Sequence, residues 1–198
     1  MPEHDWMYSV YGNVKEEVPA NAPPPKGRPV VTTTFVDANL QHCRVTGKSA
    51  TGILHVINQT PVDWYSKRQS TVETATYGAE FVAARIATKH IIDIRYMLHE
   101  MGVPIAGPSW MLGDNQSVIT SSTIPSSKLN KRHNALAYHR VRAAVAAQFL
   151  YFCYIRSNKN VADIMTKFLP YASSWPHIQP FLFCRGKTIP SCSIKVGE

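Results

Sequence analysis

Four carboxylates stand beside apolar segments of the sequence, at positions where they could do chemistry together: Asp37, Glu80, Asp114 and Asp163. The chain has only 13 Asp and Glu residues, so this placement is unexpected for a purely solvated set of acids. Carboxylates that are brought close together repel, and one stays protonated unless a cation neutralises the group. Mg²⁺ prefers oxygen ligands, and two such ions about 3.5–4 Å apart can activate a water and stabilise the leaving oxygen in phosphodiester cleavage.

Each carboxylate has a simpler explanation when it is considered alone. Asp114 directly precedes "NQSVITSS" and could be the N-cap of a short helix. Glu80 lies four residues before Ala84, in a run of apolar residues spaced by three and four, so it heads the inward face of a long helix. A buried, unpaired glutamate is costly, and Glu80 therefore needs a cation, a hydrogen-bond partner or water.

The elements that position these acids can be predicted from the periodicity of apolar residues. The predicted strands are 30–38, 52–58, 62–68, 109–114 and 149–155, and the predicted helices are 74–101, a short one after Asp114, 128–148 and 158–169. The first three strands follow one another at hairpin spacing, which indicates an antiparallel meander. The order predicts an α/β fold with a five-stranded mixed sheet, three antiparallel strands followed by two further strands, and helices on both faces.

Composition limits the domain organisation and the partners. The Pro-rich stretch in residues 1–29 predicts an extended connector, residues 30–170 carry the periodic elements, and residues 171–198 read as a loosely structured tail. The chain has 21 Lys and Arg residues and a net charge of +8, which suits a polyanionic partner. No apolar run reaches the roughly 20 residues of a membrane span. The four cysteines form no CxxC pair, so we expect reduced thiols and an intracellular protein.

Five blocks of the sequence resemble the ribonuclease H region that ends the Pol polyprotein of Ty1/copia-type retrotransposons: "FVDAN", "GILHVINQTPVDWYSKRQSTVETATYGAEFVAA", "LGDNQSVI", "KRHNALAYHRVRAAVAA" and "NVADIMTKFLP". The resemblance runs from about residue 28 to residue 170, with the blocks in family order. It implies a ribonuclease H-like fold and Mg²⁺-dependent endonucleolytic cleavage of the RNA strand in an RNA–DNA hybrid. It also implies that Asp37, Glu80, Asp114 and Asp163 bind two Mg²⁺ ions, with Mn²⁺ as a substitute.

The same resemblance implies further partners. A reverse transcriptase domain is expected upstream in the same polyprotein, and the location is expected to be cytoplasmic virus-like particles and the nucleus. Recognition of the hybrid is expected through its backbone and the 2′-hydroxyls. The candidate contacts are Asn115, Gln116, Lys67, Arg68, Arg132, His139 and Arg142. For the last three, which recur at roughly helical spacing, a solvated helix face is an equally good explanation.

One departure from the family pattern and two alternatives stay open. Many ribonucleases H carry a histidine in the loop before the last helix, whereas residues 156–160 read "RSNKN" here. A catalytically inactive, retrotransposon-derived nucleic-acid-binding module would keep the same fold. An integrase-like transposase also shares the fold, but its acids come in the order Asp, Asp, Glu, and the order Asp37, Glu80, Asp114, Asp163 favours ribonuclease H.

Overall fold

A single five-stranded mixed sheet forms the centre of the molecule. The computed structural model describes residues 10–182 except 13, 44, 125, 130 and 131. The strands are β1 (Thr32–Asn39), β2 (Ala50–Ile57), β3 (Thr60–Arg68), β4 (Ser109–Gly113) and β5 (Leu150–Tyr154). Their spatial order is β3-β2-β1-β4-β5; β1, β2 and β3 pair antiparallel, and β4 and β5 run parallel to β1. The predicted α/β fold is confirmed.

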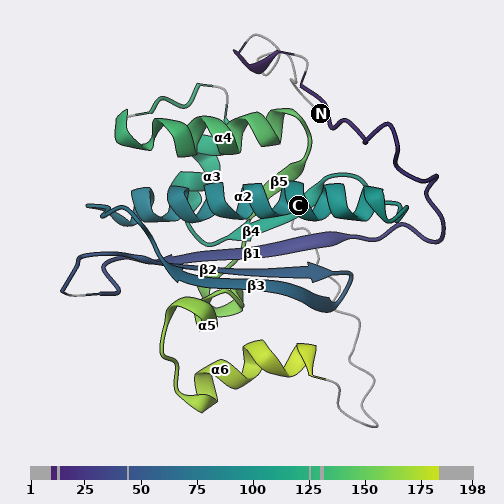
Figure 1. Cartoon of the computed structure of the whole chain (residues 1–198). Coiled ribbons are helices and arrows are strands. Elements are labelled where there is room, and N and C mark those ends of the chain that lie inside the picture. The colour runs from purple at the N-terminus through teal and green to yellow at the C-terminus, as the bar shows by residue number, and fades with distance from the viewer. Residues whose placement is uncertain (1–9, 13, 44, 125, 130–131, 183–198) are drawn as a thin grey trace.

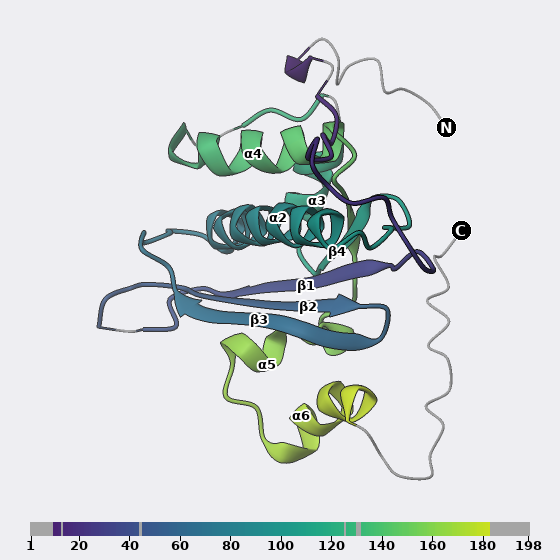
Figure 2. The same cartoon turned by 45° about the vertical axis from the view of Figure 1, so that its right-hand side comes forward.

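Helices lie on both faces of this sheet (Figure 1). On one side are α2 (Thr76–Glu100), α3 (Gln116–Thr123) and α4 (Ala135–Ala146), with α2 directly against the strands and α4 packed on α2. On the other side are α5 (Asp163–Thr166) and α6 (Tyr171–Ile178), as the rotated view also shows (Figure 2). Short 3-10 turns occur at Arg132–Asn134, Ser157–Lys159 and Gln179–Phe181.

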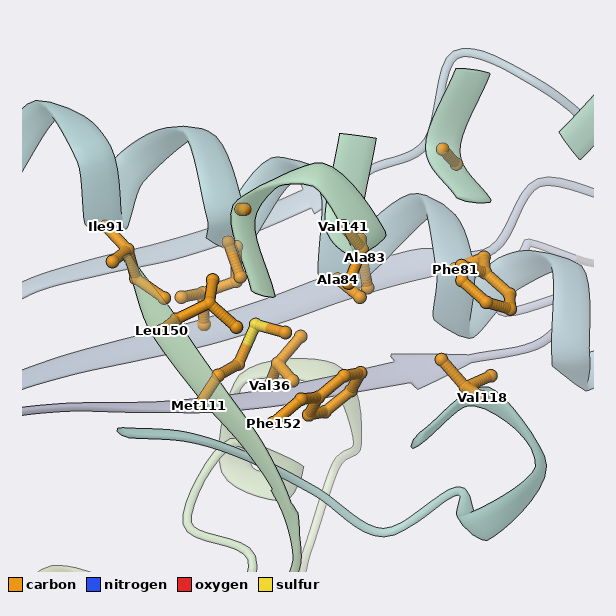
Figure 3. Packing of buried hydrophobic residues seen from close by; sticks show 14 of the residues in the cluster. Val36, Phe81, Ala83, Ala84, Ile91, Met111, Val118, Val141, Leu150 and Phe152 are labelled. Atoms are coloured by element: carbon orange, nitrogen blue, oxygen red, sulfur yellow. The ribbon is translucent and has the colours of Figure 1, made fainter. Parts of the chain in front are cut away.

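The main core lies between the sheet and α2. Alanines on α2, Ala83, Ala84 and Ala87, are almost completely buried, and their small side chains let the helix approach the strands closely. Larger side chains of the strands and of α4 fill the remaining space, among them Val36, Met111, Val141, Leu150 and Phe152 (Figure 3). A second cluster, built on Leu54, Val56 and Val161, packs on the opposite face of the sheet.

Two predicted helices are shorter than the sequence suggests. The helix expected over 128–148 begins at Ala135, after a 3-10 turn that ends at Asn134, a residue type with a low preference for helix interiors. The helix expected over 158–169 is reduced to α5. There, the buried Asn160 side chain donates to the carbonyl of Val36 and accepts from the backbone N–H of Ala162, so a local turn replaces the first helical turn.

The C-terminal segment has more structure than the expected loose tail over 171–198. It forms α6 and a following 3-10 turn, and the rings of Tyr171 and Trp175 stack one helical turn apart, with centroids 5.5 Å apart. Residues 183–198 lie outside the described part of the chain. None of the helices in the described residues is long and apolar enough to cross a membrane.

Candidate metal centre

Asp37 and Asp114 lie near the carboxyl ends of the neighbouring parallel strands β1 and β4. The ladder between β1 and β4 ends at the pair Phe35 and Leu112, and Asp37 and Asp114 each follow two residues later. Because the carboxyl ends of parallel strands meet at the same edge, both side chains reach one place. The parallel register of β1 and β4 therefore joins two acids that are far apart in the chain.

Asp114 is not the N-cap that it could have been on sequence alone. Asn115 occupies that position, and its side-chain oxygen accepts a hydrogen bond from the backbone N–H of Val118, at 3.3 Å. An N-cap satisfies one of the unpaired N–H groups of the first helical turn, so a second capping carboxylate is not needed there. Asp114 is therefore available to the cleft, which Asn115 and Gln116 also line.

The third acid comes from the first turns of α2. Glu80 is 7% exposed, and its carboxylate accepts a hydrogen bond from the backbone of Ala38 in β1. Burial raises the pKa of Glu80 well above its ordinary value, and the neighbouring carboxylates of Asp37 and Asp114 raise it further. The helix thus brings a carboxyl group to a place where its charged form is disfavoured unless a cation is present.

The fourth acid is brought in by α5, and a glycine makes room for it. Gly52 pairs directly with Asp37 across the β1–β2 ladder. A Cβ atom at Gly52 would lie 2.6 Å from Cγ2 of Thr166 and 2.7 Å from the carbonyl oxygen of Ala162, so only glycine permits this approach of α5. As a result, carboxylate oxygens of Asp37, Asp114 and Asp163 all lie within 4.8 Å of one another.

Two further residues of the same segment belong to this centre and were missed by the sequence reasoning. Lys167 Nζ lies 2.9 Å from a carboxylate oxygen of Asp163 and 3.6 Å from one of Asp37. The hydroxyl of Thr166 donates a short hydrogen bond to Asp37. The spacing of Asp163 and Lys167, four residues apart in a predicted helix, is the sequence signal that could have identified the ion pair.

The cleft formed by these residues is open and has a volume of about 640 Å³. It is lined by Asp37, Ala38, Asn39, Leu40, Thr76, Glu80, Asp114, Asn115, Gln116, Ser117, Tyr154 and Lys167. Burial raises the pKa of Asp37 to about 6, against the lowering effects of Thr166 and Lys167, and the charges of Asp163 and Asp114 add to the increase. A cluster of oxygen donors with too few cations of its own fits a hard divalent ion such as Mg²⁺.

No histidine is among the residues that line this cleft in the described part of the chain. The loop 156–160, where many ribonucleases H carry one, forms a 3-10 turn and ends in the buried Asn160. Asn160 ties this loop to β1 through the carbonyl of Val36. The role of the loop that can be observed is therefore to place α5 against the strand that carries Asp37.

The candidate nucleic-acid contacts are divided between surface and interior. Lys67, Arg68, Arg132 and Gln116 are exposed. His139 is exposed and makes a 3.0 Å contact with the hydroxyl of Tyr11.

Arg142 differs from the stripe of phosphate contacts that the helical spacing suggested. It is 3% exposed, and its guanidinium donates to the carbonyl oxygens of Ser121 and Ile124, at 2.7 and 2.8 Å. The prediction of a phosphate contact at Arg142 was wrong, because the side chain turns inward to hold the end of α3 against α4.

Two curated relatives are retrotransposon polyproteins. The chain is 30% identical over 136 residues to the retrovirus-related Pol polyprotein from transposon TNT 1-94 of Nicotiana tabacum, a match that covers 69% of this chain and 10% of that protein. It is 32% identical over 127 residues to the Ty1-JR2 Gag-Pol polyprotein of Saccharomyces cerevisiae, covering 62% of this chain and 7% of that protein. The chain thus spans a tenth or less of the length of these relatives. No protein-family model matches it.

Two solved structures share the fold. Ribonuclease H1 of Halobacterium salinarum NRC-1 superposes with a TM-score of 0.52 at 17% identity, covering 68% of this chain and 92% of that one. LC11-RNase H1 in complex with an RNA/DNA hybrid gives a TM-score of 0.50 at 15% identity, covering 69% and 92%. The predicted ribonuclease H-like fold is confirmed by these matches.

Proposed function

The chain is homologous to part of the Pol polyproteins of Ty1/copia-type retrotransposons, and we propose that it is the ribonuclease H of such a polyprotein. Its reaction is Mg²⁺-dependent endonucleolytic cleavage of the RNA strand of an RNA–DNA hybrid. A reverse transcriptase domain upstream in the same polyprotein is part of the proposal, as is a location in cytoplasmic virus-like particles and the nucleus.

The observation that carries the proposal is the meeting of four carboxylates from separate parts of the chain: Asp37, Glu80 and Asp114 line one open cleft, and Asp163 lies beside Asp37 and Asp114. Oxygens of Asp37, Asp114 and Asp163 are within 4.8 Å of one another, and Glu80 faces two of them closely enough that their charges raise its pKa. The donors are oxygens only, and the cleft leaves space for a phosphate group beside them. These four residues are proposed to hold two Mg²⁺ ions.

In such a site the ions supply an activated water and charge stabilisation for the leaving oxygen. The protein supplies the geometry. The hydroxyl of Thr166 fixes the orientation of the Asp37 carboxylate, and Asn115 fixes the start of α3 next to Asp114. Lys167 lies between Asp37 and Asp163 and partly neutralises their charges until a cation binds. The acids are therefore preorganised before a substrate arrives.

The substrate is proposed to lie across the open cleft. LC11-RNase H1, which has the same fold, is known in complex with an RNA/DNA hybrid. Lys67, Arg68, Arg132 and His139 are exposed candidates for phosphate contacts, whereas Asn115 and Gln116 line the cleft and could hydrogen-bond in the minor groove. Discrimination of RNA is expected from 2′-hydroxyls and groove shape rather than from base edges.

The test is a cleavage assay with the whole chain on end-labelled RNA–DNA hybrid, duplex RNA and duplex DNA, each titrated with Mg²⁺ and Mn²⁺. We expect metal-dependent cuts in the RNA of the hybrid only. Asp114→Asn should reduce the cleavage rate by about a thousandfold or more while hybrid binding is kept. The matched control is Asp93→Asn, an exposed aspartate on α2 outside the cleft, which should cleave like the wild type.

Two results would contradict the proposal. Undiminished turnover in Asp114→Asn would show that the carboxylate of Asp114 is not needed for cleavage. Tight binding of the hybrid by the wild type without cleavage at any metal concentration would instead support the alternative of a catalytically inactive nucleic-acid-binding module.

A further inference from the structure

A second group of metal-binding side chains lies outside the acidic cleft. It consists of His55 on β2, Asp63 on β3 and His90 on α2, and one ligand atom from each lies within 4.8 Å of the other two. His90 follows Glu80 by ten residues on the same helix, about 15 Å at the rise of an α-helix. The two groups are therefore separate sites on the same helix.

The backbone places the three residues on one face of the sheet. His55 and Asp63 are direct cross-strand partners, so their side chains point to the same side. The register shifts between His55 and Val56, where β3 carries one extra residue, and such a bulge changes where the neighbouring side chains point. His90 reaches the same place from α2, and its ring packs edge-on against Tyr65, with centroids 5.3 Å apart.

The distance between the two imidazoles fits shared coordination. Nε2 of His55 lies 3.4 Å from Nδ1 of His90. Two nitrogens bound to one tetrahedral Zn²⁺ at about 2.0–2.1 Å are about 3.3–3.4 Å apart, whereas a good hydrogen bond would bring them to about 2.9–3.0 Å. We propose that His55, His90 and Asp63 form a binding site for a divalent transition-metal ion such as Zn²⁺, with solvent completing the coordination.

The surroundings of His55 suit a metal ligand. Thr34 Oγ1 lies 2.8 Å from Nδ1 of His55 and can accept a hydrogen bond from its N–H, which leaves the Nε2 lone pair directed toward His90. Burial lowers the pKa of the His55 imidazole to about 4; the charge of His90 adds to the effect and that of Asp63 opposes it.

The opposite side of the group is open. Asp63 is exposed and His90 is half-buried, so an ion and its water ligands can enter from solvent. The ligand set of two imidazoles and one carboxylate suits Zn²⁺ and related transition metals better than Mg²⁺. An ion held there would tie α2 to the β2–β3 hairpin, and it would stabilise the folded chain because the unfolded chain lacks the site.

The experiment is calorimetric titration of Zn²⁺ into the whole chain, with excess Mg²⁺ present to occupy the acidic cleft. We expect one Zn²⁺ per chain, with its affinity lowered about a hundredfold in His90→Gln. The matched control is His99→Gln, which changes a half-buried histidine on the same helix outside the group and should bind Zn²⁺ like the wild type. Asp114→Asn should also bind it normally, which separates this site from the proposed catalytic one.

A second measurement covers the case in which a variant folds poorly. In thermal unfolding, Zn²⁺ should raise the midpoint of the wild type and of His99→Gln by several degrees, and should leave that of His90→Gln unchanged. Co²⁺ should show the visible absorption of nitrogen and oxygen coordination. The proposal is overturned if Zn²⁺ does not bind the wild type, if His90→Gln and His99→Gln bind it equally, or if Co²⁺ shows thiolate coordination. None of these readouts depends on cleavage, so the proposed nuclease function can fail or hold independently.

Discussion

The two ends of α2 each bury a charged side chain, and they do so in opposite ways. Glu80 near the first turn is 7% exposed, and Arg95 near the last turns is 4% exposed. A buried charge is stable only when it is paired or hydrogen-bonded. What surrounds each of these two residues therefore indicates what that end of the helix is for.

At the Arg95 end, the charge is satisfied within the chain. Arg95 donates from Nε and Nη2 to both carboxylate oxygens of Glu16, with 2.7 Å from Nε to Oε1, and from Nη1 to the carbonyl of Gly107 and the hydroxyl of Ser109. Burial by itself would raise the pKa of Glu16, but the neighbouring Arg95 and His99 outweigh it and lower the pKa. This end is a structural clasp for the segment before β1.

At the Glu80 end, the surrounding charges have the same sign. Asp37 and Asp114 face Glu80, burial adds to their effect, and the pKa of Glu80 is raised well above its usual range. Among the described residues, Lys167 is the cation that offsets the group, and its side chain is 36% exposed. A buried charge surrounded by partners therefore holds the fold, whereas a buried charge surrounded by like charges indicates a place for a cation from outside.

The largest change in the free energy of unfolding is expected when the ion pair at the Arg95 end of α2 is broken. Arg95→Met leaves the carbonyl of Gly107 without this donor and the Glu16 carboxylate with His99 alone, and should lower the free energy of unfolding by about 3–5 kcal/mol, measured by urea denaturation. Arg85→Met, at an exposed position of the same helix, should change it by about 0.5 kcal/mol or less. Equal values for the two variants would mean that the clasp does not hold the fold.

A change of the opposite sign in the free energy of unfolding is expected at the Glu80 end of α2, where like charges face one another. Because burial raises the pKa of Asp37 to about 6, Asp37→Asn removes a disfavoured charge. It should stabilise the metal-free protein at neutral pH by about 2 kcal/mol, measured by urea denaturation in chelator, while cleavage is lost. Asp93→Asn, at an exposed position of α2, is the control and should change neither the stability nor the cleavage rate. An Asp37→Asn variant that is less stable than the wild type would contradict the conclusion that burial disfavours the charge of Asp37.

The pH dependence of stability should separate the two ends. The folded pKa values of Asp37 and Glu80 are raised, so their contribution is fully present below pH 4 and is lost as the pH rises through about 6 and above. The pKa of Glu16 is lowered, so its contribution is present above its unfolded pKa and is lost in acid. Thermal midpoints should therefore rise by a few degrees on adding Mg²⁺ at pH 8 and hardly at all at pH 5. A Mg²⁺ effect that is equal at both values would argue against ion binding by these acids.

The smallest effect is expected for Lys167, whose positive charge partly offsets the charges of the neighbouring acids. Lys167 competes with a bound cation for Asp37 and Asp163, so Lys167→Met should raise Mg²⁺ affinity roughly three- to tenfold, measured by calorimetry. Lys159→Met, an exposed lysine in the preceding loop, is the control and should leave the affinity unchanged. Weaker Mg²⁺ binding in Lys167→Met would mean that the ammonium positions the acids rather than competing for them.

Periodicity was sufficient to predict the sheet and the long helix. The strand ends near Asp37 and Asp114 and the inward position of Glu80 follow from alternation and from steps of three and four, which are local properties of the chain. The helix before β5 and the one after it were predicted too long. In the later helix, Asn160 makes side-chain hydrogen bonds that a hydrophobic pattern does not reveal, and the earlier helix starts only after a 3-10 turn that ends at Asn134. The exposure of Arg142 was predicted wrongly, because helical spacing shows which residues share a helix face but not whether another element covers that face.

Residue type and period are local properties of the chain, and they were enough to single out the candidate acids and the strands and helices near them. How those elements meet could be seen only in the folded chain: the parallel register that joins Asp37 to Asp114, the missing side chain at Gly52 that admits α5, and the place of Lys167 between two acids. The roles of the four acids as metal ligands stay a prediction. Contacts between distant segments depend on packing and on loop closure, and these depend on the whole chain at once.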